Sequence, residues 1–153
     1  MEVIEDQLVT IDDDGIILSV TSDDGPADVD LGEGMILLPG LVDTHLHASQ
    51  WPQLGTALDQ PLERWLFDYT FPLEARYEDP AFALKVWDSM IPALLKRGTT
   101  TAVYYSSVHE PATLSLAEAC IAYGQRAFVG RVAMDHPDGT PEWYRDSGPS
   151  QSV

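Results

Sequence analysis

Two histidines separated by one residue, His45 and His47, follow an apolar run that Pro39 and Gly40 interrupt. Side chains alternate between the two faces of a strand, so Asp43, His45 and His47 are expected to project from the same face. Two neutral imidazoles in this arrangement can bind one divalent cation, and imidazole suits zinc, iron or another transition metal. Asp43 is expected to orient the first histidine, or the loop that follows, from behind the ligands. The spacing therefore predicts one half of a metal site.

The other histidines, the cysteine and two adjacent serines are weaker candidates. His109 follows an expected strand, where it can either face the same site or lie in a solvated loop. His136 is followed by Pro-Asp-Gly and is expected on a turn surface, whereas Cys120 lies on an apolar helix and is expected in the core. Ser106, Ser107 and His109 do not form a nucleophile set, because no orienting acid or strained turn accompanies them.

Alternating strands and helices must position the histidine pair. An apolar run at 36–43 leads into the first strand, which carries the pair at its end. Strands joined by helices make right-handed crossovers, so a parallel sheet is expected, with the active site at the carboxyl ends of its strands. The further expected elements are strands at 99–105 and 126–134 and helices at 61–69, at 80–97 with Asp79 as its N-cap, and at 112–123 before Gly124.

Three segments of different character are expected along the chain. In residues 1–35, short apolar runs alternate with Asp-Gly turns, a pattern typical of an antiparallel hairpin. Residues 36–135 carry the alternating strands and helices. Residues 136–153 are rich in Pro, Gly, Asp and Ser, which indicates loop.

The composition is that of a folded but unusually acidic chain. Of its 153 residues 44% are hydrophobic, as in ordinary globular proteins, but 25 acidic residues stand against 8 basic ones. This charge repels phosphate backbones and anionic lipids, so neither nucleic-acid nor membrane partners are expected. It suits either work in concentrated salt or an ordinary solvated acidic face. A single cysteine, the absence of a basic and apolar leader and the lack of a long apolar run predict a cytoplasmic protein.

Several sequence motifs resemble those of a known family. The run from Pro39 to His47 resembles the first-strand signature of the amidohydrolase superfamily, metal-dependent enzymes with a (β/α)8 barrel and a small accompanying β-sandwich. Further along, the chain resembles the guanine deaminase family within that superfamily. The motifs that carry this narrower resemblance are Ala48–Gln50, Trp65-Leu66 with Tyr69–Pro72, Gly98–Ala102 and Gly124–Gly130.

This resemblance implies roles for individual residues. His45 and His47 match the family's first two metal ligands, with zinc as the expected metal, and Gln50 matches the glutamine that hydrogen-bonds the purine. An amide suits this role because it offers two donors and an acceptor. Trp51 is expected either to stack on the base or to fill space under a loop. The implied reaction is hydrolytic deamination of guanine to xanthine and ammonia by a metal-activated water, in a homodimeric enzyme of purine catabolism.

Part of the family's active site has no counterpart in this sequence. A barrel needs eight strand and helix units in roughly 250 residues, so the chain is predicted to be the N-terminal part of a longer enzyme. The family's remaining ligands, two histidines and an aspartate, and its proton-shuttling glutamate have no matching position before Val153. Weak metal retention and no deaminase activity are therefore expected of this chain alone.

Three alternatives stay open from the sequence. The chain can belong to another amidohydrolase that acts on a different purine or a pyrimidine. It can be a truncated product without catalytic function. It can also assemble with a second chain that completes the barrel, because the last expected strand leaves an unpaired edge.

Overall fold

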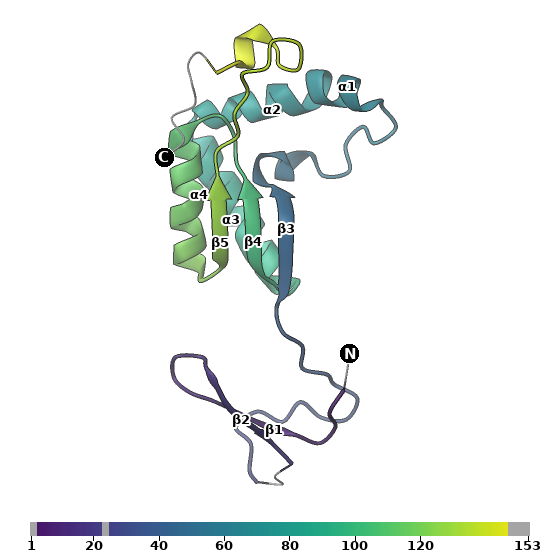
Figure 1. Cartoon of the computed structure of the whole chain (residues 1–153), viewed down its shortest axis with the longest axis vertical. Helices are drawn as coiled ribbons and strands as arrows, with labels where there is room; N and C mark the ends of the chain where they lie inside the picture. Colours follow the sequence, from purple (N-terminus) through teal and green to yellow (C-terminus); the bar gives the residue numbers. More distant parts are fainter. Residues whose placement is uncertain (1–2, 23–24, 147–153) are drawn as a thin grey trace. The chain divides into compact units, whose positions relative to one another are not determined.

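A computed structural model of the chain describes residues 3–22 and 25–146 (Figure 1). The chain folds as two units, residues 1–38 and residues 39–153. None of the helices in the described residues has the length and apolarity that a membrane span needs.

The first unit is built on a hairpin. Strand β1 (Leu8–Ile11) pairs antiparallel with β2 (Ile17–Thr21), as the Asp-Gly turn predicts. Within the turn, Asp12 Oδ1 accepts hydrogen bonds from the backbone N–H groups of Asp14 at 3.0 Å and Ile16 at 2.8 Å. Gly15 has a φ of 81°, which glycine adopts without steric cost. The expected antiparallel pairing is confirmed.

A parallel sheet organises the second unit. Its strands are β3 (Leu41–His47), β4 (Thr99–Tyr105) and β5 (Arg126–Gly130), in the order β3-β4-β5. Both pairings are parallel, so the expected sheet is confirmed. The carboxyl ends of the three strands meet at one edge, where His47 pairs in register with Tyr105.

Two strand boundaries differ from the prediction. The apolar run from residue 36 lies outside β3, which begins at Leu41, directly after Pro39, which lacks a backbone donor, and Gly40. Strand β5 ends at Gly130 instead of reaching residue 134, because Gly130 pairs with Tyr105, the last residue of β4. Beyond that point the Val132 N–H still donates to the Ser107 carbonyl at 3.3 Å, but the described residues show no further strand pairing.

Helices α3 and α4 connect the strands close to the expected bounds. Helix α3 (Pro80–Lys96) is capped by Asp79, whose side chain accepts from the Ala81 N–H at 2.9 Å. Helix α4 (Glu110–Tyr123) begins two residues earlier than predicted. It ends at Gly124, which is left-handed with a φ of 71°.

The helical segment after residue 61 is interrupted and longer than expected. Helix α1 (Leu62–Trp65) continues through a π-helical turn (Leu66–Thr70) into α2 (Phe71–Ala75) and a 3-10 turn (Arg76–Glu78). Pro72 lacks the backbone N–H of a regular helix, and a π-helical turn is one way to accommodate that loss. The predicted helical character of residues 61–69 is confirmed from Leu62 onward, but the helical segment does not end at residue 69.

The core lies between the sheet and helices α3 and α4. Trp87 of α3 is fully buried, and its indole N–H donates to Ser115 Oγ on α4 at 3.1 Å. Cys120 is buried, as expected, and burial raises the pKa of its thiol to about 11. The principal core residues are Tyr77, Ala83, Val86, Trp87, Met90, Ile91, Ala102, Tyr104, Ala112, Leu116, Ala119 and Cys120.

The segment expected to be loop after residue 135 contains one ordered turn. Residues Glu142–Tyr144 form a 3-10 helix, and the Tyr144 side chain is buried. His136 lies on an exposed turn, as expected, where its Nδ1 accepts from the Asp138 and Gly139 N–H groups at 3.2 Å. Residues 147–153 of this segment lie outside the described residues.

Candidate metal centre

The two histidine rings converge at the carboxyl end of β3. His45 Nε2 and His47 Nε2 lie 3.2 Å apart. The Tyr105 ring from β4 lies against both, with ring centroids 4.8 Å from His45 and 5.1 Å from His47. Because Tyr105 is the register partner of His47, the strand pairing itself places this ring beside the pair. The pair and Tyr105 form a compact group at the edge of the sheet.

The spacing of the two nitrogens fits a shared metal ion. Metal to nitrogen distances of about 2.0 to 2.1 Å and a tetrahedral angle place two ligating nitrogens about 3.3 to 3.4 Å apart, close to the 3.2 Å between the Nε2 atoms. Burial, and then the neighbouring His45, lower the pKa of His47. A lowered pKa favours the neutral imidazole, which is the form that binds metals.

The pair supplies only part of a metal coordination sphere. Within the described residues, no group of three or more His, Cys, Asp or Glu side chains is placed to hold a metal ion. Structural and catalytic zinc sites take three or four protein ligands. The two imidazoles therefore fit a metal as two of its ligands.

Asp43 acts on the backbone of the first histidine. Its Oδ1 accepts a hydrogen bond from the His45 N–H at 3.0 Å. The strand register with β4 shifts between Asp43 and Leu46, so the ladder is irregular at this point. The carboxylate thus satisfies a backbone donor beside this irregularity, and the described contacts do not include one to an imidazole ring.

A buried acid, Glu74 on α2, joins the segment after the histidines to two distant parts of the chain. Glu74 is 4% exposed, and its Oε1 accepts from Ser49 Oγ at 2.9 Å and from Gln50 Nε2 at 3.2 Å. Its Oε2 accepts from Tyr144 Oη at 3.1 Å. Burial raises the pKa of Glu74, although the hydrogen bonds from all three donors act in the opposite direction.

Glu74 is not among the site residues predicted from the sequence. Phe71 and Glu74 are three residues apart on one face of α2, and both are buried. The sequence feature that could have pointed to Glu74 is an acid placed on the same helical face as the large apolar residue Phe71. Tyr144 could not be found in this way, since it lies 70 residues from Glu74 in the sequence.

The other candidate residues have different surroundings. Trp51 is half-buried in the 3-10 helix Ala48–Gln53 and packs against the hydrophobic core. His109 is half-buried at the start of α4, and its Nε2 has no hydrogen-bond partner in the described residues. Burial lowers the pKa of His109, although the charges of Glu78 and Asp146 oppose this shift.

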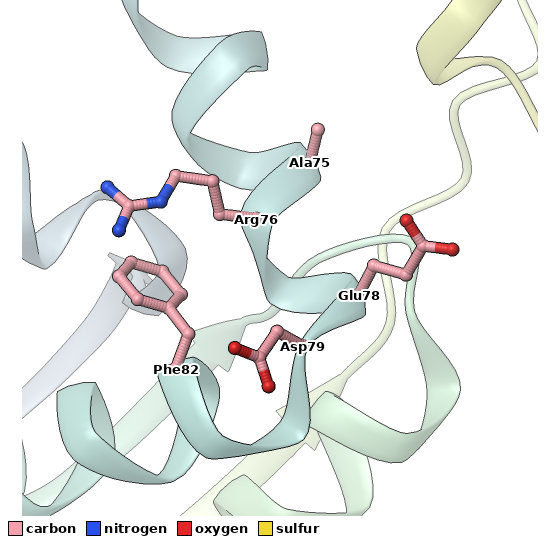
Figure 2. Close-up of a pocket in the computed structure, with 5 residues that line it drawn as sticks. All are labelled: Ala75, Arg76, Glu78, Asp79 and Phe82. Carbon is pink, nitrogen blue, oxygen red and sulfur yellow. The ribbon is translucent and has the colours of Figure 1, made fainter.

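Two hollows in the second unit lie apart from the histidine pair. The larger, of about 420 Å³, is open to solvent between the end of α2 and the start of α3. Figure 2 shows Arg76 beside the Phe82 ring in this hollow, and the Arg76 Cζ lies 4.0 Å from the ring centroid. None of its lining residues is a predicted site residue. The smaller hollow contains Trp65, whose indole N–H donates to the Thr56 carbonyl at 2.9 Å.

A family model decides the relationship of this chain to known proteins. The amidohydrolase family matches residues 36–149, which include β3 and both histidines. The chain belongs to the amidohydrolase family. The α/β fold with a parallel sheet is therefore of the TIM-barrel type that this family and its solved structures have.

Individual relatives of this amidohydrolase are named guanine deaminases. The human enzyme is 40% identical over 155 residues, covering 94% of this chain and 34% of its own. The Escherichia coli enzyme is 38% identical over 117 residues, covering 76% of this chain and 26% of its own. The crystal structure of Clostridium acetobutylicum guanine deaminase, which has guanine bound in its active site, superposes with a TM-score of 0.78 at 34% identity, over 92% of this chain and 34% of that one.

The resemblance to guanine deaminases that the sequence indicated is confirmed by these similarities. This amidohydrolase spans about a third of the length of the curated relatives that it matches, the human enzyme among them.

Proposed function

We propose that this amidohydrolase supplies the first part of the active site of a guanine deaminase. The complete enzyme in this proposal is a zinc-dependent hydrolase that acts on a C–N bond. The observation that carries the proposal is the 3.2 Å approach of His45 Nε2 and His47 Nε2 at the carboxyl end of β3. Similarity to guanine deaminases over 94% of the chain supports the choice of substrate. Iron or another transition metal is an alternative to zinc, since imidazole binds each of them.

Each residue of the proposed site has a separate task. His45 and His47 hold the metal through their Nε2 atoms, and a divalent metal, when bound, supplies Lewis acidity for hydrolysis. Gln50 binds the purine through its side-chain amide. Trp51 contributes an aromatic surface beside Gln50, and Asp43 keeps the backbone of His45 in place. The acid that moves protons during deamination is not assigned to any residue of this chain.

The larger architecture is also part of the proposal. Strands β3, β4 and β5 are the first three strands of an eight-stranded barrel, and the hairpin of β1 and β2 belongs to an accompanying β-sandwich. The apolar side chains on β2, Ile17, Leu18 and Val20, are all exposed, which supports this because such side chains are usually covered by other elements. The homodimer, the exclusion of nucleic acids and membranes, and the cytoplasmic location stay predictions.

A composite enzyme tests the proposed function. It joins this chain, where its similarity ends, to the remaining two thirds of Clostridium acetobutylicum guanine deaminase. We expect it to convert guanine to xanthine, measured by absorbance, and to lose at least about 100-fold in kcat when His45 or His47 is changed to alanine. His136→Ala is the matched control, because this histidine lies on an exposed turn and is not among the residues of the proposed site.

Other outcomes of this experiment contradict the proposal in different ways. Selective turnover of cytosine or of an adenine derivative would assign the chain to an amidohydrolase with another substrate. A folded, zinc-loaded composite without turnover of any of these bases would favour a non-catalytic product.

A further inference from the structure

The buried carboxyl group of Glu74 has no task in the proposed chemistry, although it contacts a residue that does. A buried ionised carboxylate is costly unless it is well hydrogen-bonded. Glu74 satisfies this condition with three donors, Ser49, Gln50 and Tyr144. A well-packed apolar residue often stabilises a fold as much or more, so stability alone does not account for an acid here.

The hydrogen bond from Gln50 selects one orientation of its side-chain amide. An ionised carboxylate only accepts hydrogen bonds, so the amide must turn its NH2 group and not its oxygen toward Glu74. The Oε1 atom of Gln50 accepts no hydrogen bond from the described residues, so it is left for a donor from elsewhere. Glu74 thereby decides which end of the amide is available.

The residue before Gln50 is fixed by the same group of contacts. Ser49 is fully buried, and its Oγ lies 2.9 Å from Glu74 Oε1 and 3.3 Å from the Ser106 carbonyl oxygen. Tyr77 Oη donates to the Ser49 carbonyl at 2.9 Å. The backbone that carries Gln50 is thus tied to α2 and to the end of β4.

From these contacts we infer that Glu74 is a positioning residue, which holds Gln50 so that its amide oxygen faces a hydrogen-bond donor of the substrate. The inference rests on the proposed function, because that proposal gives Gln50 its task. Tyr144 supports the carboxylate from the opposite side through Oε2. Glu74 itself contacts neither the substrate nor the metal in this scheme.

Two variants separate the geometry of Glu74 from its charge. Glu74→Asp keeps the carboxylate but withdraws it by one methylene, which removes the reach to Gln50. Glu74→Gln keeps the reach and loses the charge. Glu118→Asp, at an exposed position of α4, is the matched control.

The first measurement uses this chain without modification. We expect the side-chain NH2 of Gln50, assigned by NMR through its loss in Gln50→Ala, to show one slowly exchanging, downfield proton. This signal should persist in Glu74→Gln and in the control and should be lost in Glu74→Asp. A Gln50 signal like that of a solvated amide in the unmodified chain would overturn the inference.

The second measurement is a double-mutant cycle in the composite enzyme. Glu74→Asp is expected to raise the KM for guanine by roughly 10-fold or more, because misplaced binding groups cost this much, while Glu74→Gln retains most of the affinity. In a Gln50→Ala background the same substitution should change KM by less than about 2-fold, because Glu74 then has no amide to position and only the usual scatter of additivity remains. Equal effects in both backgrounds would show that Glu74 does not act through Gln50.

The two measurements distinguish this inference from the proposed function. If the composite enzyme with Glu74 and Gln50 intact does not deaminate guanine, the proposed function fails. The NMR signal of Gln50 in the unmodified chain still decides whether Glu74 orients the amide.

Discussion

At the scale of single residues, burial shifts the pKa of two groups in the candidate site, and at one of them, Glu74, hydrogen bonds oppose the shift. Desolvation lowers the pKa of His47 and raises that of Glu74, in both cases favouring the neutral form. For His47 the neutral form is the metal-binding one. For Glu74 three donors partly compensate for burial, so the carboxyl group is held in place at a cost in stability that depends on pH.

The raised pKa of Glu74 predicts how that cost changes with pH. The folded chain holds the Glu74 proton more tightly than the unfolded chain, so stability falls as pH rises from about the ordinary value of 4.5 through the raised pKa. Glu74→Gln removes this dependence. We therefore expect the free energy of unfolding of Glu74→Gln, relative to the unmodified chain, to increase with pH across this window and then level off.

Urea unfolding at several pH values between about 4.5 and 8 measures this difference. Tyr77 and Tyr144, whose pKa values both respond to the charge of Glu74, stay protonated across the range because burial raises the pKa of both. A difference between the two chains that does not vary with pH would contradict the predicted shift.

At the scale of elements, the strand that carries the histidines begins at a close approach to its neighbouring strand. Gly40 lies directly before β3, opposite Thr100 of β4. A Cβ atom at Gly40 would lie 2.6 Å from Thr100 Cγ2 and 2.7 Å from Thr100 Cβ. Because Cβ is fixed to the backbone, rotation of the threonine side chain does not relieve this contact. The start of β3 can therefore lie this close to β4 only because residue 40 has no side chain.

Gly40→Ala is expected to destabilise the second unit. The inserted methyl group must push β3 and β4 apart, and overpacking of this kind costs roughly 1 to 3 kcal/mol. Urea unfolding monitored by tryptophan fluorescence measures the loss, since Trp87 lies in the core of this unit.

Gly130→Ala is the control for this substitution. Gly130 lies in the same sheet, but a Cβ there would meet only the Tyr104 carbonyl oxygen, at an ordinary 3.8 Å. Equal stability losses for the two substitutions would show that the contact with Thr100 is not the cause.

At the scale of the whole molecule, the described residues contribute part of a site and part of a fold. The histidine pair fits two of the ligands of a metal, and the chain spans about a third of the length of its human relative. Strands β3 and β5 each have one unpaired edge in the three-stranded sheet. The chemistry that we propose depends on elements that these residues do not provide.

Metal content is expected to reflect this incomplete site. Two imidazoles supply only two of the three or four protein ligands that zinc sites have, so this chain should retain well below one equivalent after gel filtration. The composite enzyme should retain about one. Elemental analysis of both proteins measures the difference. His45→Ala with His47→Ala should abolish what the chain alone retains, and a full equivalent held by the unmodified chain would contradict the prediction.

Local features of the site and of the fold could be predicted from the sequence alone. The period-two spacing of His45 and His47 predicted one shared face, because neighbouring side chains in a strand alternate, and their Nε2 atoms do converge. Asp79 and Gly124 marked helix ends correctly, since capping depends on a few adjacent backbone groups. Binding of a metal by the histidine pair, and of a purine by Gln50 and Trp51, stays a prediction.

Features that depend on contacts between distant parts of the chain could be seen only once the fold was known. Strand β5 ends where its neighbour ends, and its own residues do not encode that length. The grouping of Ser49, Gln50 and Tyr144 around Glu74 joins segments up to 70 residues apart, so no local pattern could indicate it. Hydrogen bonds across such separations form only when packing brings the chain segments together, so the partners of Glu74 could be identified only in the fold.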